Sequence, residues 1–124
     1  MSTRTITGNL ATDPEVVQAG SINITKLRVI ENTGEYRTGK WHAHPDATTH
    51  FVEARFALGD NAATTLHKGD SVIVIGREHT NSWGDDGAKH YVRVIDADNI
   101  GIDLNRTVAH IQRAPKSDDA EWSL

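Results

Sequence analysis

Short runs in which apolar and polar residues alternate constrain this fold more than any other feature of the sequence. Within residues 24–30, Leu27 and Val29 fall on one side, whereas Lys26 and Arg28 fall on the other. An alternation with a period of two is typical of a β-strand that buries one face. The pattern therefore predicts a sheet whose inner face supplies the core and whose outer face carries charged side chains.

Further strands are predicted for residues 4–10, 51–56, 71–80 and 90–97. Gly8-Asn9 is expected to end the first of them as a turn or bulge, and Gly76 is expected to interrupt the strand 71–80. The glycine- and aspartate-rich residues 83–87 predict the turn of a closing hairpin. We expect one more short strand within residues 101–114.

Residues 60–67 are predicted to form the one helix. An aspartate–asparagine pair stands at the start of this segment as a capping signal, and Gly69 follows its end. Residues 32–49 are polar and contain two glycines and one proline, so we expect a long loop. Five strands with a short helix between the third and the fourth predict an all-β protein with the OB-fold, a five-stranded Greek-key barrel.

At 124 residues, the chain has the length of one domain. We assign residues 1–113 to the OB-fold domain and residues 114–124 to a short acidic tail that is expected to be disordered. The sequence contains no cysteine, which excludes disulfides and thiolate zinc sites. Because it has no run of about 18 apolar residues and no leader-like N-terminus, we expect a cytoplasmic protein.

The formal net charge of −4 argues at first sight against a nucleic acid partner. Lys116 and the three acids of residues 118–121 carry −2 of this charge, so the body of the chain is close to neutral. The placement of charge matters more than its sum. Any binding of a polyanion must therefore depend on a local cluster of cations together with stacking.

Several segments, in the same order, resemble the bacterial single-stranded DNA-binding protein family. They are the opening Thr7–Leu10 followed by Asp13–Glu15, the stretch Leu66–Arg77, and Trp83 with Tyr91 and residues 97–101. Residues 104–114 are similar to the extension of actinobacterial members. The family's tryptophan on the second strand is replaced here by Arg28 and Ile30, and its Pro-Phe tip is missing. These departures favour a phage-encoded or secondary paralogue.

The resemblance implies sequence-independent binding and protection of single-stranded DNA in replication, recombination or repair. It also implies a homotetramer that is associated with the nucleoid, or lies in the host cytoplasm if the protein is phage-encoded. No catalytic triad, phosphate loop or pair of buried acids stands out in the sequence, so we expect neither an enzyme nor a cofactor.

Exposed aromatic rings are the side chains on which unpaired bases stack. Phe51 is opposite in phase to Val52, Ala54 and Phe56, and this uniformly apolar set is taken as the core face. Phe51 should therefore face outward, although an exposed or subunit-interface role is the alternative. The predicted stacking residues are Phe51, Trp83, Trp41 and Tyr91. For Trp83, Trp41 and Tyr91, packing within the fold remains the competing interpretation.

Cations beside these rings would neutralise phosphates. The candidates are Arg28, Arg55, Arg77, Lys89, Arg93 and Lys40, although surface arginines also serve solvation and minor ion pairs. Glu53 and Glu78 are close enough in sequence to cancel part of this charge. We therefore expect binding that is weaker or more sensitive to salt than that of a basic OB-fold.

The tail offers a docking hypothesis beside plain disorder. Its acidic and apolar residues could together dock into a pocket on a replication or repair protein, and they are Asp118, Asp119, Glu121, Trp122 and Leu124.

Two rival functions stay open. One is an OB-fold assembly or interaction module with little or no DNA binding, which suits the acidic balance. The other is a metal protein or enzyme built on His42, His44 and His50. Because Asp46 is the only carboxylate near these histidines, we expect no metal site.

Overall fold

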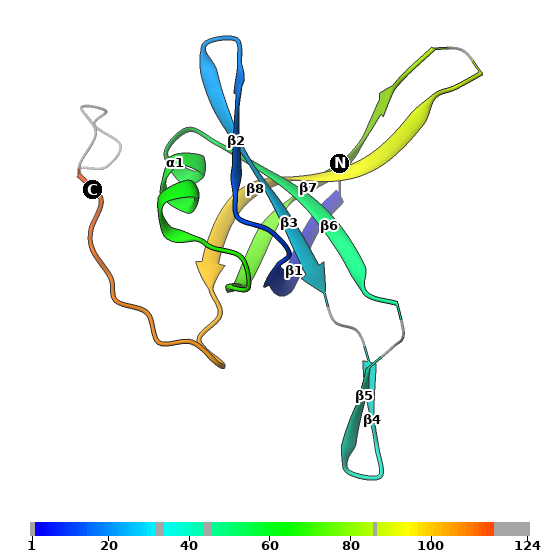
Figure 1. Ribbon diagram of the computed structural model, residues 1–124, viewed down its shortest axis with the longest axis vertical. Coiled ribbons are helices and arrows are strands. Elements are labelled where there is room, and N and C mark those ends of the chain that lie inside the picture. Colours follow the sequence, from blue (N-terminus) through cyan, green and yellow to red (C-terminus); the bar gives the residue numbers. More distant parts are fainter. Residues whose placement is uncertain (1, 32–33, 44–45, 86, 116–124) are drawn as a thin grey trace.

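The computed structural model describes residues 2–31, 34–43, 46–85 and 87–115, and these form eight strands and one helix. Their order along the chain is β1 (Ser2–Leu10), β2 (Glu15–Ala19), β3 (Ile22–Glu31), β4 (Gly34–Arg37), β5 (Lys40–Ala43), β6 (Thr48–Arg55), α1 (Phe56–Thr65), β7 (Ser71–Trp83) and β8 (His90–Ile102). Figure 1 shows a curved sheet from which three hairpins project, with α1 at one end.

Six strands form one sheet in the order β1-β7-β8-β6-β3-β2, and β1 also pairs with β3. The second pairing closes the sheet on itself, because Asn9 lies opposite Ser71 on β7 and opposite Ile30 on β3. Gly8 permits this closure, since a Cβ at its position would overlap the carbonyl of Ile30. The expected turn at Gly8-Asn9 is therefore wrong, because both residues continue β1.

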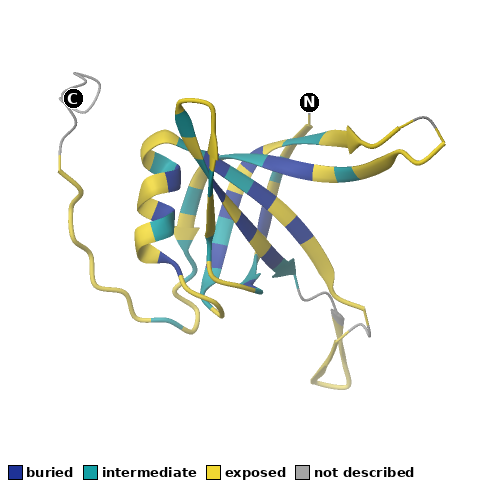
Figure 2. Cartoon of the chain, turned by 45° about the horizontal axis from the view of Figure 1, so that its top comes forward, coloured by how far each residue is buried: buried dark blue, intermediate teal, exposed yellow. Residues whose placement is uncertain are grey.

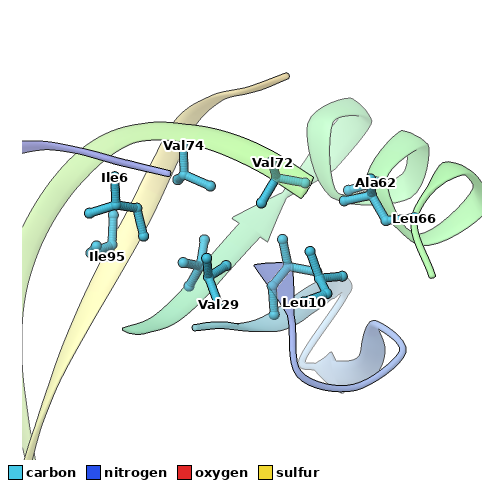
Figure 3. Packing of buried hydrophobic residues seen from close by; sticks show 10 residues of the cluster. Ile6, Leu10, Val29, Ala62, Leu66, Val72, Val74 and Ile95 are labelled. Atoms are coloured by element: carbon cyan, nitrogen blue, oxygen red, sulfur yellow. The ribbon is translucent and has the colours of Figure 1, made fainter. Parts of the chain in front are cut away.

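The core lies inside the closed sheet and beneath α1. The inward-facing residues of β1, β3, β6, β7 and β8 supply it, and Figure 3 shows these side chains meeting. The buried cluster consists of Ile6, Leu10, Leu27, Val29, Val52, Val72, Val74 and Ile95 from the sheet with Ala62 and Leu66 from the helix region. Each large aliphatic side chain buried in this way stabilises the fold by about 1.5–3 kcal/mol.

The helix begins four residues earlier than the sequence predicts. It starts at Phe56, whose φ is 59°, and Arg55 at the N-cap makes no side-chain capping bond, so the Asp60-Asn61 pair lies inside the helix. Phe56 itself is 69% exposed, and its assignment to the core face is wrong because the strand phase ends at Arg55. Thr25 fixes the helix on the sheet by donating a buried 2.8 Å hydrogen bond to the Gly59 carbonyl.

The predicted loop 32–49 contains a hairpin of its own. β4 and β5 pair through a two-residue turn at Thr38 and Gly39, both with positive φ, which is the geometry that tight hairpins prefer. The described side chains of this hairpin are exposed on both faces, as Figure 2 shows. The pattern of buried and exposed residues that reveals a packed strand is therefore missing there.

The structure contains three strands, β2, β4 and β5, that the sequence does not predict. All five predicted strands form, as β1, β3, β6, β7 and β8, but the predicted total of five is wrong, because β2, β4 and β5 bring it to eight and α1 lies between the sixth and the seventh strand. The further strand expected within residues 101–114 is likewise wrong, since β8 ends at Ile102 and residues 103–115 form no strand. Within the described part of the chain, no helix is long and apolar enough to cross a membrane.

Two glycine predictions are confirmed. The β7–β8 register shifts between Ile75 and Gly76, so the strand is irregular where the glycine interrupts the aliphatic run. Gly84 and Gly87 both have positive φ in the turn that follows Trp83. The resulting long hairpin carries an arm, residues 79–85 and 87–93, that projects beyond the rest of the sheet (Figure 1).

Candidate nucleic-acid interface

The outer face of the sheet carries a groove of about 410 Å³ between β3, β6 and the arm. Register explains which side chains reach it. Arg28 lies opposite Phe51 across the β3–β6 pair, and Phe51 lies opposite Val94 across the parallel β6–β8 pair. Since these three residues are directly opposed on neighbouring strands, they share one face. The groove floor thus joins a cation, a ring and an aliphatic side chain.

The two aromatic rings of the groove are Phe51 and Trp83, which are 38% and 54% exposed. Phe51 comes from the sheet, whereas Trp83 is the last residue of β7 and reaches the groove from the arm. The ring of His90 stacks on Trp83 at 5.4 Å between centroids, with 26° between the planes. The rings of Phe51 and Trp83 are therefore accessible on the same face. His90, which lies opposite Trp83 on β8, holds the Trp83 ring in place.

Two cations line the groove, Lys26 and Arg28. Among the described residues, neither has a carboxylate within ion-pair distance. The Arg28 guanidinium carbon lies 5.8 Å from the centroid of the Phe51 ring. These cations can therefore meet an anionic ligand without first breaking an ion pair.

Acids also line the groove and balance these cations. Lys26 lies between Glu15 on β2 and Glu53 on β6 in one row across three strands, and both carboxylates belong to the groove wall. The four charged side chains of the lining therefore sum to zero. A phosphate backbone gains little from such a surface as a whole, so stacking on the rings must supply most of the affinity.

Three of the predicted phosphate contacts are engaged in ion pairs. Arg55 lies 3.0 Å from Glu53 and 3.0 Å from Asp96, and Arg77 lies 3.2 Å from Asp98. Arg93 approaches Glu78 at 3.7 Å but remains 75% exposed. Of these three, Arg93 is thus the most accessible to a ligand.

The remaining predicted residues lie away from the groove floor. Lys89 is exposed just before β8, and Tyr91 is opposite in phase to Val92, which lines the groove. Lys40 and Trp41 belong to the β4–β5 hairpin, where Trp41 packs edge-on against Tyr36 at 5.1 Å. The tail residues Asp118, Asp119, Glu121, Trp122 and Leu124 and His44 lie outside the described residues.

Trp41 lines a separate hollow of about 700 Å³. This hollow lies between the β4–β5 hairpin, β1 and the segment after β8, and its lining includes Asn9, Ser71 and Arg106. The structure therefore brings Phe51, Trp83 and Arg28 together but places Trp41 in different surroundings. Among the described residues, no group of three or more histidines and acids is arranged to hold a metal ion.

The sequence profile of the Single-strand binding protein family matches residues 1–103. The chain belongs to this family. "Single-stranded DNA-binding protein 2" of Tropheryma whipplei is 35% identical over 102 residues, which cover 81% of this chain and 67% of that protein. The family membership agrees with the exposed rings and unpaired cations of the groove.

Two solved structures share the fold. The small single-stranded DNA-binding protein from Streptomyces coelicolor superposes with a TM-score of 0.75 at 26% identity, covering 86% of this chain and 97% of that one. The second single-stranded DNA-binding protein from Mycobacterium smegmatis gives 0.70 at 26% identity, covering 90% and 98%. These relatives confirm the family suggested by the ordered sequence segments.

Sequence reasoning missed two residues of the groove lining, Lys26 and Asn81, and the ring of His90 that stacks on Trp83. Lys26 precedes Arg28 by two positions and shares its outward phase, and Asn81 stands in the same relation to Trp83. Because side chains on one face of a strand recur at every second residue, both positions follow from those of Arg28 and Trp83. His90 could not be found in this way, because its contact with Trp83 depends on the register of the β7–β8 hairpin.

Proposed function

We propose that this protein binds and protects single-stranded DNA without regard to sequence. The observation that carries the proposal is the groove in which the exposed rings of Phe51 and Trp83 lie beside the unpaired cations Lys26 and Arg28. Every unpaired base offers a flat face to an aromatic ring, and each stacked base contributes about 1–3 kcal/mol. The name of the family supports the same ligand.

The balance of charges shapes the expected binding. Salt weakens the binding of single strands with a slope of about −0.7 for each phosphate that is neutralised. Because Glu15 and Glu53 offset the two groove cations, only a few phosphates are neutralised there, and we expect a shallow slope. The sequence alone predicts binding that is weaker or more sensitive to salt, and the measured salt slope decides between the two predictions.

The family is a DNA-binding family and not a family of enzymes, so the groove is a binding surface. Within the fold, we propose that the five longest strands, β1, β3, β6, β7 and β8, form the OB-fold barrel, to which β2 and the β4–β5 hairpin are additions. The pairing of β1 with both β7 and β3 supports this closure.

The larger assembly and the cellular setting belong to the same proposal. We place residues 1–113 in the DNA-binding domain and residues 114–124 in a docking tail for replication or repair proteins. We propose a homotetramer in the nucleoid or host cytoplasm. Ile75, which is 39% exposed on the outer face of β7, supports contact with further copies. Sedimentation at several protein concentrations tests the tetramer, and a sedimenting monomer contradicts it.

The alternative of an OB-fold interaction module with little or no DNA binding depends on the neutral charge of the groove. A titration with poly(dT) at two salt concentrations separates the two functions. Quenching of tryptophan fluorescence at both concentrations, with affinity that falls as salt rises, supports DNA binding. Failure to bind poly(dT) at low salt, where phosphate contacts are strongest, would assign the chain to the alternative.

A further inference from the structure

Phe51 stands at a fork in the sheet. The β6–β8 pairing runs from Glu53 opposite Asp96 to Phe51 opposite Val94 and extends no further toward the start of β6. Beyond this last pair, residues 48–50 of β6 and the arm diverge, and Figures 1 and 2 both show the open angle between them. The side chain of Phe51 therefore lies at the opening that connects the two faces of the sheet.

A second hollow opens on the other side of this fork. It measures about 230 Å³ and is lined by Arg4, Thr48, Thr49, His50, Phe51, Glu78, Arg93 and Ile95. Phe51 is the residue that this second hollow shares with the groove. A ligand that stacks on Phe51 can therefore reach both cavities without crossing another element of the sheet.

The second hollow contains more cationic than anionic charge. Arg4 places one guanidinium nitrogen 3.2 Å from each carboxylate oxygen of Glu78, and Arg93 lies 3.7 Å from one of the same oxygens. Among the residues that line this hollow, two guanidinium groups thus share one carboxylate, which leaves a surplus of one positive charge, and Glu31 lies just outside the lining. His50 adds a buried imidazole whose Nε2 lies 3.7 Å from Glu31 and makes no hydrogen bond to the described residues.

On the side of the groove away from the fork, acids exceed cations by one. Asp96 and Glu53 lie there with Glu15 and Asp98, and Arg55, Arg77 and Lys26 do not fully offset these four carboxylates. A strand whose bases stack in the groove will therefore hold its backbone away from this acidic row. Beyond Lys26 and Arg28 of the groove itself, a strand that passes over Phe51 meets its next cations on the Arg4–Arg93 side.

We propose that the second hollow is an additional phosphodiester subsite, which a single strand reaches by passing over Phe51 through the fork. This inference rests on the proposed function, because the same strand occupies the groove. Arg93, already exposed, meets the phosphate first, and Arg4 follows by exchanging part of its contact with Glu78 for one with the phosphate. The hydroxyl groups of Thr48 and Thr49 supply uncharged donors beside it.

The test compares a short and a long strand. OB-folds cover about 4–16 nucleotides, so we take oligothymidylates of roughly 4 and roughly 16 nucleotides as probes. Affinities are measured from 50 to 200 mM salt for the wild type, Arg4→Gln and Arg93→Gln. Each variant should make the salt slope shallower by about 0.7 for the long strand and leave that of the short strand unchanged. Lys68→Gln, in the turn after α1, is the control cation and should change neither slope.

Glu78→Gln provides a second measurement with the opposite sign. Removal of the carboxylate frees both guanidinium groups, so binding of the long strand should tighten and its slope should steepen. Thermal unfolding of each variant shows whether it is folded. If Arg4→Gln does not fold, Glu78→Gln still tests the subsite.

The outcomes distinguish the two proposals. Equal slopes for the wild type, Arg4→Gln and Arg93→Gln on the long strand would overturn the second subsite while leaving the groove intact. Equal losses on both strands would also overturn it, because the arginines would then act within the groove. Failure of the wild type to bind either strand would instead remove the proposed function itself, and the subsite with it.

Discussion

Arg28 lies over the ring of Phe51, with its guanidinium carbon 5.8 Å from the ring centroid across the β3–β6 pair. A cation over an exposed ring contributes about 0.5–1 kcal/mol. In the free protein the arginine thus occupies part of the surface that a base would use. A planar guanidinium can itself stack on a base, so an incoming base either stacks on Arg28 or moves it toward a phosphate.

Removal of either groove ring should weaken the binding of poly(dT). We expect Phe51→Ala and Trp83→Ala each to cost about 1–3 kcal/mol, because each removes one stacking surface. Equilibrium titration followed by fluorescence anisotropy of labelled oligothymidylate measures the loss. Phe56→Ala is the matched control, since Phe56 is also exposed but lies at the start of α1. A loss of the same size in the control would show that the groove is misassigned.

Arg28 and Arg77 should differ in their effect on salt dependence. Arg28→Ala should make the slope of log affinity against log salt shallower by about 0.7, because this cation is free to meet a phosphate. Arg77→Ala should change the slope less, since Arg77 is paired with Asp98 at 3.2 Å. Arg28→Lys should keep the slope but bind more weakly, because an ammonium group cannot stack as a guanidinium does. Identical slopes for all three variants would contradict the role of Arg28.

Gly8 and Gly76 should be sensitive to a single added methyl group. A Cβ at Gly8 would overlap the Ile30 carbonyl, and one at Gly76 would overlap the Asp96 carbonyl. Gly8→Ala and Gly76→Ala should therefore lower the free energy of unfolding by about 1–3 kcal/mol, as measured by urea denaturation. Gly101→Ala has open space around its Cβ and should not destabilise the protein. Equal stability of all three variants would show that the sheet does not close as described.

Thr25→Val should destabilise the contact between α1 and the sheet. The buried hydroxyl of Thr25 donates to the Gly59 carbonyl at 2.8 Å, and loss of such a bond costs about 0.5–1.5 kcal/mol. Thr64→Val removes a comparable bond to the Asp60 carbonyl on the exposed side of the helix and should change stability by less than about 0.5 kcal/mol. Thermal unfolding measures both, and a reversed order would contradict the anchoring role.

The sequence indicated much of the groove because a period of two assigns faces. Leu27 and Val29 are buried and Arg28 is exposed, as their alternation predicts, and the outward position of Phe51 is confirmed in the same way. The alternation of residues 51–56 predicts the wrong face for Phe56, because a strand pattern does not extend past the end of β6 into the helix. A periodic pattern holds only within one element, and its boundary depends on the backbone conformation at Arg55 and Phe56.

Ion pairs between strands were outside the reach of sequence reasoning. Arg55 is indistinguishable in the sequence from Arg28, since both are exposed-phase arginines on strands. The parallel pairing of β6 with β8 brings Asp96 to within 3.0 Å of Arg55, whereas Arg28 receives the ring of Phe51 instead. The 41 positions that separate Arg55 from Asp96 carry no local signal of this contact.

The sequence by itself determined which residues of β3 and β6 are buried, because the alternation of side chains is a local property of extended backbone. It also determined the family, through ordered segments that the comparisons confirm. Only the tertiary structure decided which rings share a groove, which arginines remain unpaired and where β1 closes the sheet. These features depend on register between strands that are distant in the chain, and register is set by packing of the whole sheet.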